Sequence, residues 1–161
     1  MRLVDPCPSR WRSLFQQHAD QLASALPSAD IEHIGSTAIA TIAAKDVVDI
    51  IVGVDVEAFA SAVETTKRLG YRLDGRRDLH AWLCWPRVDD RRVIIHLVPA
   101  GGDEWVRRIR FRDVLRADRT LAAEYEAIKQ RAADATDDWT EYTGMKRDFV
   151  QRVLTRTGMD R

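Results

Sequence analysis

One apolar run with a carboxylate inside it constrains the fold of this chain most. Residues 47–52 read Val-Val-Asp-Ile-Ile-Val, a composition typical of a buried central strand, which we expect over 46–54. An ionised carboxylate in such a strand is costly unless it is paired, hydrogen-bonded or bound to a cation. Asp49 therefore indicates either a ligand site or a structural ion pair, with Lys45 as the nearest candidate partner.

A turn of small residues precedes this strand. Gly35, Ser36 and Thr37 supply backbone N–H groups, two hydroxyls and room for close approach, which are the features that bind a phosphate or another anion. The alternative is that they form only a tight turn and a helix cap.

Alternation along the strands predicts which side chains share a face. In the strand over 46–54, Asp49 lies on the same face as Ile51 and Gly53. In a second strand, expected over 92–99, His96 is the polar member of an apolar stretch. Whether His96 faces Asp49 depends on strand register, which the sequence does not fix.

The periodicity of apolar residues outlines the other elements. We expect a helix that starts at Pro8-Ser9 and stops before Pro27, a helix over 57–69, a short strand over 31–34, a hairpin made by 80–86 and 92–99, and helices through 103–155. This order predicts an α/β fold, a mixed sheet with helices packed on it. We expect one domain over 1–161, with a sheet core in 1–100 and a helical segment in 101–161.

Composition narrows the function classes. The 161 residues include 25 basic and 25 acidic side chains, so no net charge steers the molecule toward nucleic acid or an anionic membrane. Two cysteines are too few for a disulfide framework or a cysteine-based zinc site. There is no signal-peptide core and no apolar run of about 20 residues. We expect a cytoplasmic protein with a small-molecule partner; its oligomeric state is left open.

Two segments are specific enough to indicate a family. Residues 32–38, Glu-His-Ile-Gly-Ser-Thr-Ala, and residues 111–116, Phe-Arg-Asp-Val-Leu-Arg, resemble the GrpB family in order and spacing. The other matching parts are the helix with Trp11, Ala44-Lys45, Val48-Asp49-Ile50, His96-Leu97-Val98, Tyr125 with Lys129, and Tyr142 with Lys146. That family resembles a divergent branch of the nucleotidyltransferase superfamily, which includes polymerase beta. The resemblance, which covers nearly the whole chain, implies a nucleotidyltransferase-like fold with a helical C-terminal segment.

The resemblance also implies a cation site, which this sequence matches only in part. The nucleotidyltransferase pattern has a Gly-Ser turn, two carboxylates on alternate residues of a strand and a third on a neighbouring strand, and these acids hold two magnesium ions. Asp49 matches, but Val47 and Ile51 hold the two positions where its partner is expected, and His96 lies near the third. An aspartate with a histidine suits a transition metal, or no metal at all, better than magnesium.

Basic side chains in the C-terminal helices are candidates for neutralising a bound anion. Arg112, Lys129 and Lys146 are expected to approach the Gly35-Ser36 turn, and Lys45 adds a cation just before the strand. Packing and solvated helix faces are the alternative roles.

Three functions remain open at this point. The first is a transferase acting on a nucleotide or another phosphate- or carboxylate-bearing small molecule, with Asp49 as base or cation ligand, and His96 and His33 as further catalytic candidates. The second is a non-catalytic protein that binds a nucleotide or small anion, which Ile51 favours. The third is an interaction module in which these side chains are structural.

Overall fold

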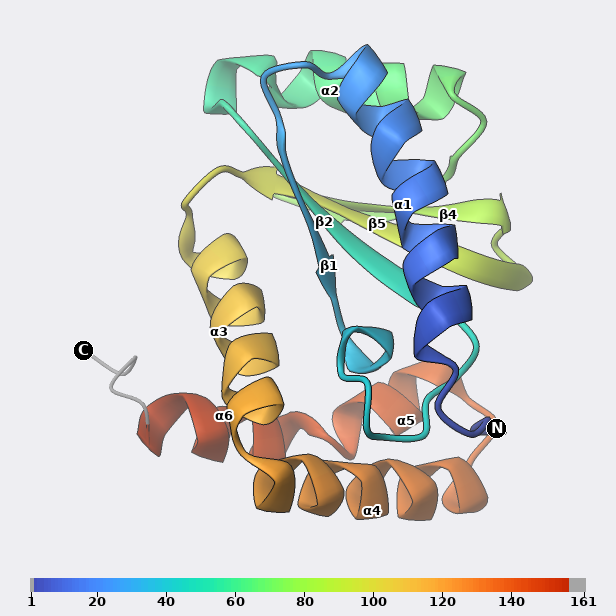
Figure 1. Ribbon diagram of the computed structural model, residues 1–161. Coiled ribbons are helices and arrows are strands. Elements are labelled where there is room, and N and C mark those ends of the chain that lie inside the picture. The colour runs from blue at the N-terminus through green and yellow to red at the C-terminus, as the bar shows by residue number, and fades with distance from the viewer. Residues whose placement is uncertain (1, 157–161) are drawn as a thin grey trace.

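The computed structural model describes residues 2–156, and its centre is a five-stranded mixed sheet in the order β1-β2-β5-β4-β3 (Figure 1). The strands are β1 (Asp30–Ile34), β2 (Val48–Val54), β3 (Arg72–Arg77), β4 (His80–Arg87) and β5 (Asp90–Pro99). β2 and β5 run parallel, and the other neighbouring pairs are antiparallel. The predicted mixed sheet with helices on it is therefore confirmed.

Two helices cover one face of the sheet. These are α1 (Pro8–Ala25) and α2 (Phe59–Arg68), which contact β2 and β5 respectively. The alternate residues of β2 that face them, Val48, Ile50 and Val52, are fully buried in the main hydrophobic core. Removal of so much branched apolar surface from water is the main term that stabilises the sheet.

The opposite face of β2 carries Asp49, as the alternation predicts. Next to it on that face, Ile51 is fully buried in a smaller apolar cluster with Ile34 and Val98. Trp105 of α3 (Asp103–Ala117) packs against this cluster. One end of the face is thus closed by hydrocarbon, and Asp49 lies beside the closed part.

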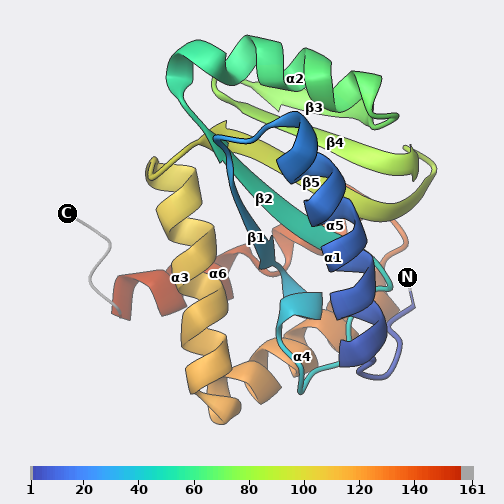
Figure 2. The same ribbon diagram turned by 45° about the horizontal axis from the view of Figure 1, so that its top comes forward.

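The C-terminal segment is helical, as predicted. After α3 come α4 (Arg119–Ala135), α5 (Trp139–Gly144) and α6 (Arg147–Arg156). An aromatic cluster of Phe111, Tyr125 and Phe149 joins α3, α4 and α6. α4 lies at the end of the molecule away from α2 in both views, and α3 runs along the side of the sheet toward that end (Figures 1 and 2). Among residues 2–156, no helix is long and apolar enough to cross a membrane.

The structure differs from the expected elements mainly at β3 and at the starts of α2 and β2. β3 reads Arg-Leu-Asp-Gly-Arg-Arg and lies outside the expected strands, because an exposed edge strand buries little and shows no apolar alternation. The expected helix over 57–69 opens with a 3-10 turn (Val56–Ala58), and α2 proper begins at Phe59. β2 begins at Val48 rather than at residue 46, where the Asp46 carboxylate instead accepts hydrogen bonds from Arg10 and Trp11 of α1.

Candidate functional site

Asp49 lies at the centre of the candidate site, beside the Gly35 turn. Its side chain is 28% exposed and therefore open to solvent on one side. Gly35 has a φ of 72°, and a Cβ atom there would overlap Oδ2 of Asp49. Only glycine lets the turn approach the carboxylate this closely at a positive φ. A 3-10 turn (Ser36–Ala38) follows directly.

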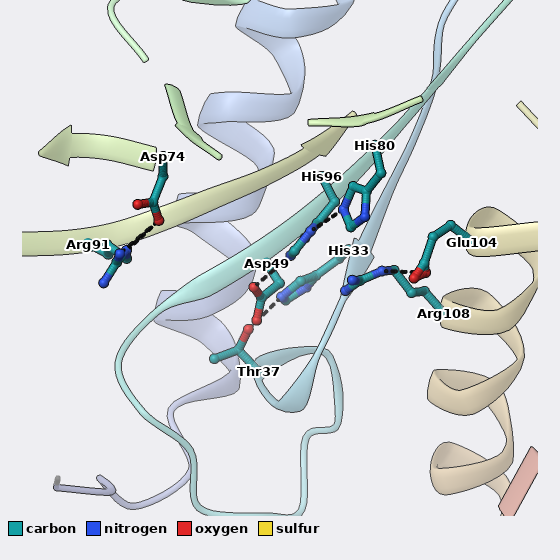
Figure 3. Close-up of polar contacts among 9 residues, drawn as sticks. All are labelled: His33, Thr37, Asp49, Asp74, His80, Arg91, His96, Glu104 and Arg108. Carbon is teal, nitrogen blue, oxygen red and sulfur yellow. Dashed lines mark hydrogen bonds and ion pairs between the residues drawn. The ribbon is translucent and has the colours of Figure 1, made fainter. Parts of the chain in front are cut away.

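His96 lies on the same sheet face as Asp49, an arrangement that depends on strand register. The parallel pairing of β2 and β5 sets His96 beside Ile51, and its Nε2 atom lies 3.4 Å from Oδ1 of Asp49 (Figure 3). On its other side, Nδ1 of His96 lies 3.1 Å from Nε2 of His80. The three side chains form a hydrogen-bonded row that starts at the half-buried carboxylate of Asp49.

The imidazoles near Asp49 are neutral at physiological pH. Burial lowers the pKa of His80 and that of His33 to about 4, and burial also lowers the pKa of His96. The negative charge of Asp49 is therefore not compensated by an imidazolium.

His33 supports the turn. Its Nε2 atom lies 2.9 Å from Oγ1 of Thr37, and its ring stacks on Phe15 with centroids 5.0 Å apart. Thr37 is buried and engaged in this contact. Burial raises the pKa of Tyr125 of α4 to about 12 and the nearby Ser36 side chain opposes that rise, so the turn lies close to the C-terminal helices as well.

Lys45 lies in an aromatic enclosure formed by α5. Its Nζ atom is 3.3 Å from the centre of the Tyr142 ring and 3.8 Å from that of Trp139. The Nζ atom is buried, and within the described residues it has no hydrogen-bond partner. Cation–π contacts stabilise an ammonium group but provide no acceptor for its protons.

Lys146 places a second ammonium group against the same ring, 4.1 Å from the centre of Tyr142. Among residues 2–156, no ion pair joins a carboxylate to Lys45 or to Lys146. Burial, together with the charge of Lys146, lowers the pKa of Lys45 to about 7, and burial lowers the pKa of Lys146 to about 8. The charge of Asp49 opposes both shifts, so its field reaches both ammonium groups.

Lys129 is buried but already bonded to the backbone. It donates a hydrogen bond to the carbonyl of Ala43, whose N–H donates to Glu126 at 2.5 Å. Burial lowers the pKa of Lys129 to about 7. Together, Lys129 and Glu126 fix the segment that leads from the turn to Lys45.

Arg112 does not present its guanidinium to the turn as a free cation. It is buried, donates to Glu32 at 2.6 Å, to the His33 carbonyl at 2.9 Å and to Asp113 at 2.8 Å, and thereby ties α3 to β1. Arg116, one helical turn further on, donates to the Ala38 carbonyl at 2.8 Å. Both arginines hold the backbone around the turn: Arg112 through three bonds to protein acceptors, and Arg116 through its Nε atom alone.

The donor set does not fit the two-cation template of nucleotidyltransferases. Ile51, at the position expected for a second carboxylate, is enclosed in hydrocarbon, and His96 supplies a nitrogen that already contacts Asp49. Among the residues described, no group of three or more His, Cys, Asp or Glu side chains is placed to hold a metal ion. Magnesium requires several oxygen ligands in near-octahedral geometry, which one carboxylate does not provide.

Sequence reasoning misses His80. The signal is present, because alternation places His80 and Trp82 on one face of β4, and the hairpin pairs Trp82 with His96. The aromatic enclosure of Lys45 has no comparable signal, since Trp139 and Tyr142 lie much further along the chain.

Comparison with known proteins agrees with this architecture. The family described as "GrpB protein" matches residues 2–156. The chain belongs to the GrpB family. A UPF0157 protein of Deinococcus radiodurans is 52% identical over 157 residues, which cover 97% of this chain and 82% of that protein. The crystal structure of the conserved protein GrpB from Enterococcus faecalis has a TM-score of 0.84 at 26% identity and covers 96% of both chains.

A more distant solved structure resembles this GrpB protein in its fold only. The structure of a GLD-2/RNP-8 complex matches with a TM-score of 0.52 at 12% identity, over 88% of this chain and 51% of that one. The mixed sheet and its helices are thus nucleotidyltransferase-like, as the resemblance implied.

Proposed function

We propose that this GrpB protein binds the phosphate groups of a nucleotide or a similar small molecule and transfers a phosphorus-bearing group from it to an acceptor hydroxyl. The observation that carries the proposal is the Nζ atom of Lys45, which is buried, has no hydrogen-bond partner among the described residues and shares the Tyr142 ring with Lys146, whose charge acts on it. Two ammonium groups around one ring, neither of them ion-paired with a carboxylate among the described residues, favour an anion as the missing partner, because charge-assisted hydrogen bonds would satisfy both.

The chemistry assigned to the site follows from where the charges lie. The phosphate oxygens accept hydrogen bonds from Lys45 and Lys146, and the Gly35 turn forms the wall on the side of Asp49. Asp49 accepts the proton of the acceptor hydroxyl while the oxygen of that hydroxyl forms a bond to phosphorus. The bond to the leaving phosphate then breaks, and the lysines neutralise the charge that it carries away. No step is assigned to a cation, because the donor set does not match the two-carboxylate template.

A second candidate is binding without transfer. The hydrocarbon of Ile51 beside Asp49 favours it, since that position would carry a second acid in the template of the superfamily. In this case the lysines still bind phosphate, and Asp49 only orients the ligand.

Two assays on the whole protein separate these functions. Thermal melts with inorganic pyrophosphate and with each of the four common nucleoside triphosphates measure binding; a ligand at about 100 times its Kd should add roughly 2.7 kcal/mol, or about 5–10 °C in Tm. Release of pyrophosphate from the triphosphates, with an alcohol-bearing acceptor panel, measures transfer.

The expected result is stabilisation by at least one of these ligands, and turnover that Asp49→Asn abolishes while leaving the stabilisation intact. Stabilisation without turnover in any acceptor mixture would favour the binding protein. No thermal shift with any phosphate ligand would contradict both candidates.

A further inference from the structure

Three side chains beside the proposed phosphate site form a row whose hydrogen bonds have only one consistent direction. Nε2 of His80 lies 3.1 Å from Nδ1 of His96, and Nε2 of His96 lies 3.4 Å from Oδ1 of Asp49. The two rings are tilted by 43° with centroids 5.4 Å apart, so the contact joins ring nitrogens rather than stacked faces (Figure 3).

The number of donors and acceptors on the three side chains sets the direction of the two hydrogen bonds. Both imidazoles are neutral, so each carries a single N–H. An ionised carboxylate only accepts hydrogen bonds; the proton of His96 therefore resides on Nε2 and points to Asp49. Nδ1 of His96 is then a lone pair, and His80 must carry its own proton on Nε2 to donate to it.

The surroundings leave the middle of this row little contact with solvent. The His96 side chain is only 14% exposed, and the His80 and Trp82 rings pack edge to face with centroids 5.3 Å apart. The charged groups that influence the two rings are Arg108 and Glu104 of α3, which pair with each other at 3.5 Å, Asp49 at the far end and Arg77 beside His80.

We propose that His80 is a positioning residue for Asp49 and acts on it through His96. The N–H of His80 holds the His96 ring in the tautomer and orientation that donate to Oδ1. This leaves Oδ2, the oxygen packed against Gly35, to receive a proton or a hydrogen bond from a ligand. A catalytic role for this positioning rests on the proposed transferase function. The hydrogen-bond row itself is independent of that function.

The reverse tautomer is the informative alternative. With the proton on Nδ1, His96 would turn a lone pair toward the carboxylate, which is repulsive unless a cation lies between the two atoms. The site of the His96 proton therefore distinguishes a hydrogen-bonded dyad from a metal-binding pair.

The test is ¹⁵N NMR of the histidine side chains in the ligand-free protein at neutral pH. We expect both His80 and His96 to carry the proton on Nε2, and the Nε2–H proton of His96 to be visible because it is protected from exchange. His80→Leu, which removes the donor, should broaden or abolish that proton signal. His80→Gln, whose amide can donate from a similar position, should retain it. His18→Gln is the matched control, since His18 bonds to Tyr71 on the other face of the sheet.

Two results would overturn the proposal. One is an unprotonated Nε2 in His96 of the natural protein, which requires no variant and is unaffected by folding defects. The other is a His96 signal in folded His80→Leu that equals the natural one. Since neither spectrum involves a ligand, failure of the phosphate-binding function would leave this result unchanged.

Discussion

The ammonium group of Lys45 lies 3.3 Å from the centre of the Tyr142 ring and, among the described residues, has no hydrogen-bond acceptor. A buried ammonium group without an acceptor costs stability in the ligand-free protein, and under the proposed function a bound anion would supply that acceptor. The change in the free energy of unfolding when Lys45 is replaced therefore shows whether this lysine stabilises the fold or destabilises it.

We predict that Lys45→Met raises the stability of the free protein in a pH-dependent way. The pKa of Lys45 is about 7 in the fold against an ordinary value of 10.5, so the unfolded chain binds more protons between these pH values. The cost of the lysine is full below pH 7 and disappears as the pH rises toward 10.5. The variant should gain about 1–2 kcal/mol at pH 7, after the lost cation–π contacts are subtracted, and nothing near pH 10.

Denaturant melts of both proteins across this pH range check the prediction. Lys67→Met is the control, because Lys67 is exposed on α2 and pairs with Glu64. Its effect should stay within about 0.5 kcal/mol at every pH. A Lys45→Met protein that is less stable than the natural one at pH 7 would show that the aromatic enclosure is structural.

Gly35→Ala tests the close approach of the turn to Asp49. The new Cβ atom would overlap Oδ2 of Asp49 at a φ of 72°, so the turn and the carboxylate must move apart. Gly70→Ala is a matched control, since Gly70 also has a positive φ, 99°, but a Cβ atom added there would meet nothing within 4 Å.

We expect Gly70→Ala to cost about 1 kcal/mol, from backbone strain alone, and Gly35→Ala to cost roughly 1–3 kcal/mol more. Urea unfolding measures both. Equal costs would mean that the contact between Gly35 and Asp49 adds no constraint.

Arg112→Met is predicted to destabilise the fold without weakening phosphate binding. Loss of the guanidinium leaves the His33 carbonyl without its 2.9 Å donor and separates Glu32 from α3, for a cost of about 1–3 kcal/mol. Arg107→Met on the same helix removes only an exposed contact to Glu104 and should cost less than about 1 kcal/mol. If pyrophosphate affinity fell with Arg112→Met while stability did not, the arginine would belong to the anion site after all.

Ile51→Asp introduces an acid at the position where the nucleotidyltransferase pattern has its second carboxylate. The new carboxylate enters an apolar cluster beside Asp49, so we expect a loss of several kcal/mol in the absence of divalent ions and partial recovery with magnesium. Ile51→Asn distinguishes the effect of a buried polar group from that of a buried charge. The Ile51→Asn protein should also be less stable than the natural one, but magnesium should not restore its stability. Thermal melts with and without magnesium distinguish the two. A large magnesium response of the natural protein would show that it binds the cation despite its single carboxylate.

The main elements of the fold are predictable because they follow from periodic burial. The strand around Asp49 is buried on both faces and reads as a continuous apolar run, whereas the long C-terminal helices bury one face each, and both patterns are visible in the sequence. β3 is not predictable in this way, because Arg72–Arg77 is an edge strand held by backbone pairing with β4 rather than by apolar side chains.

The site is predictable only in its local part. The turn and Asp49 are close in sequence, and the register of β2 with β5 then decides the place of His96. The partners of the basic residues depend on how helices that are distant in the sequence pack together, and a local sequence pattern does not predict that packing. Arg112 therefore resembles an anion ligand in the sequence although it pairs with Glu32, and the sequence does not indicate that α5 encloses Lys45.

Calorimetric titration with inorganic pyrophosphate measures whether Lys45 and Lys146 bind phosphate. We predict that the natural protein and Lys67→Met bind it with the same Kd, and that Lys45→Met and Lys146→Met each bind roughly 10- to 100-fold more weakly, because each loses a charge-assisted hydrogen bond worth about 1.5–3 kcal/mol. Equal affinity in all four proteins, or no binding to the natural one, would contradict the assignment of these two lysines to a phosphate site.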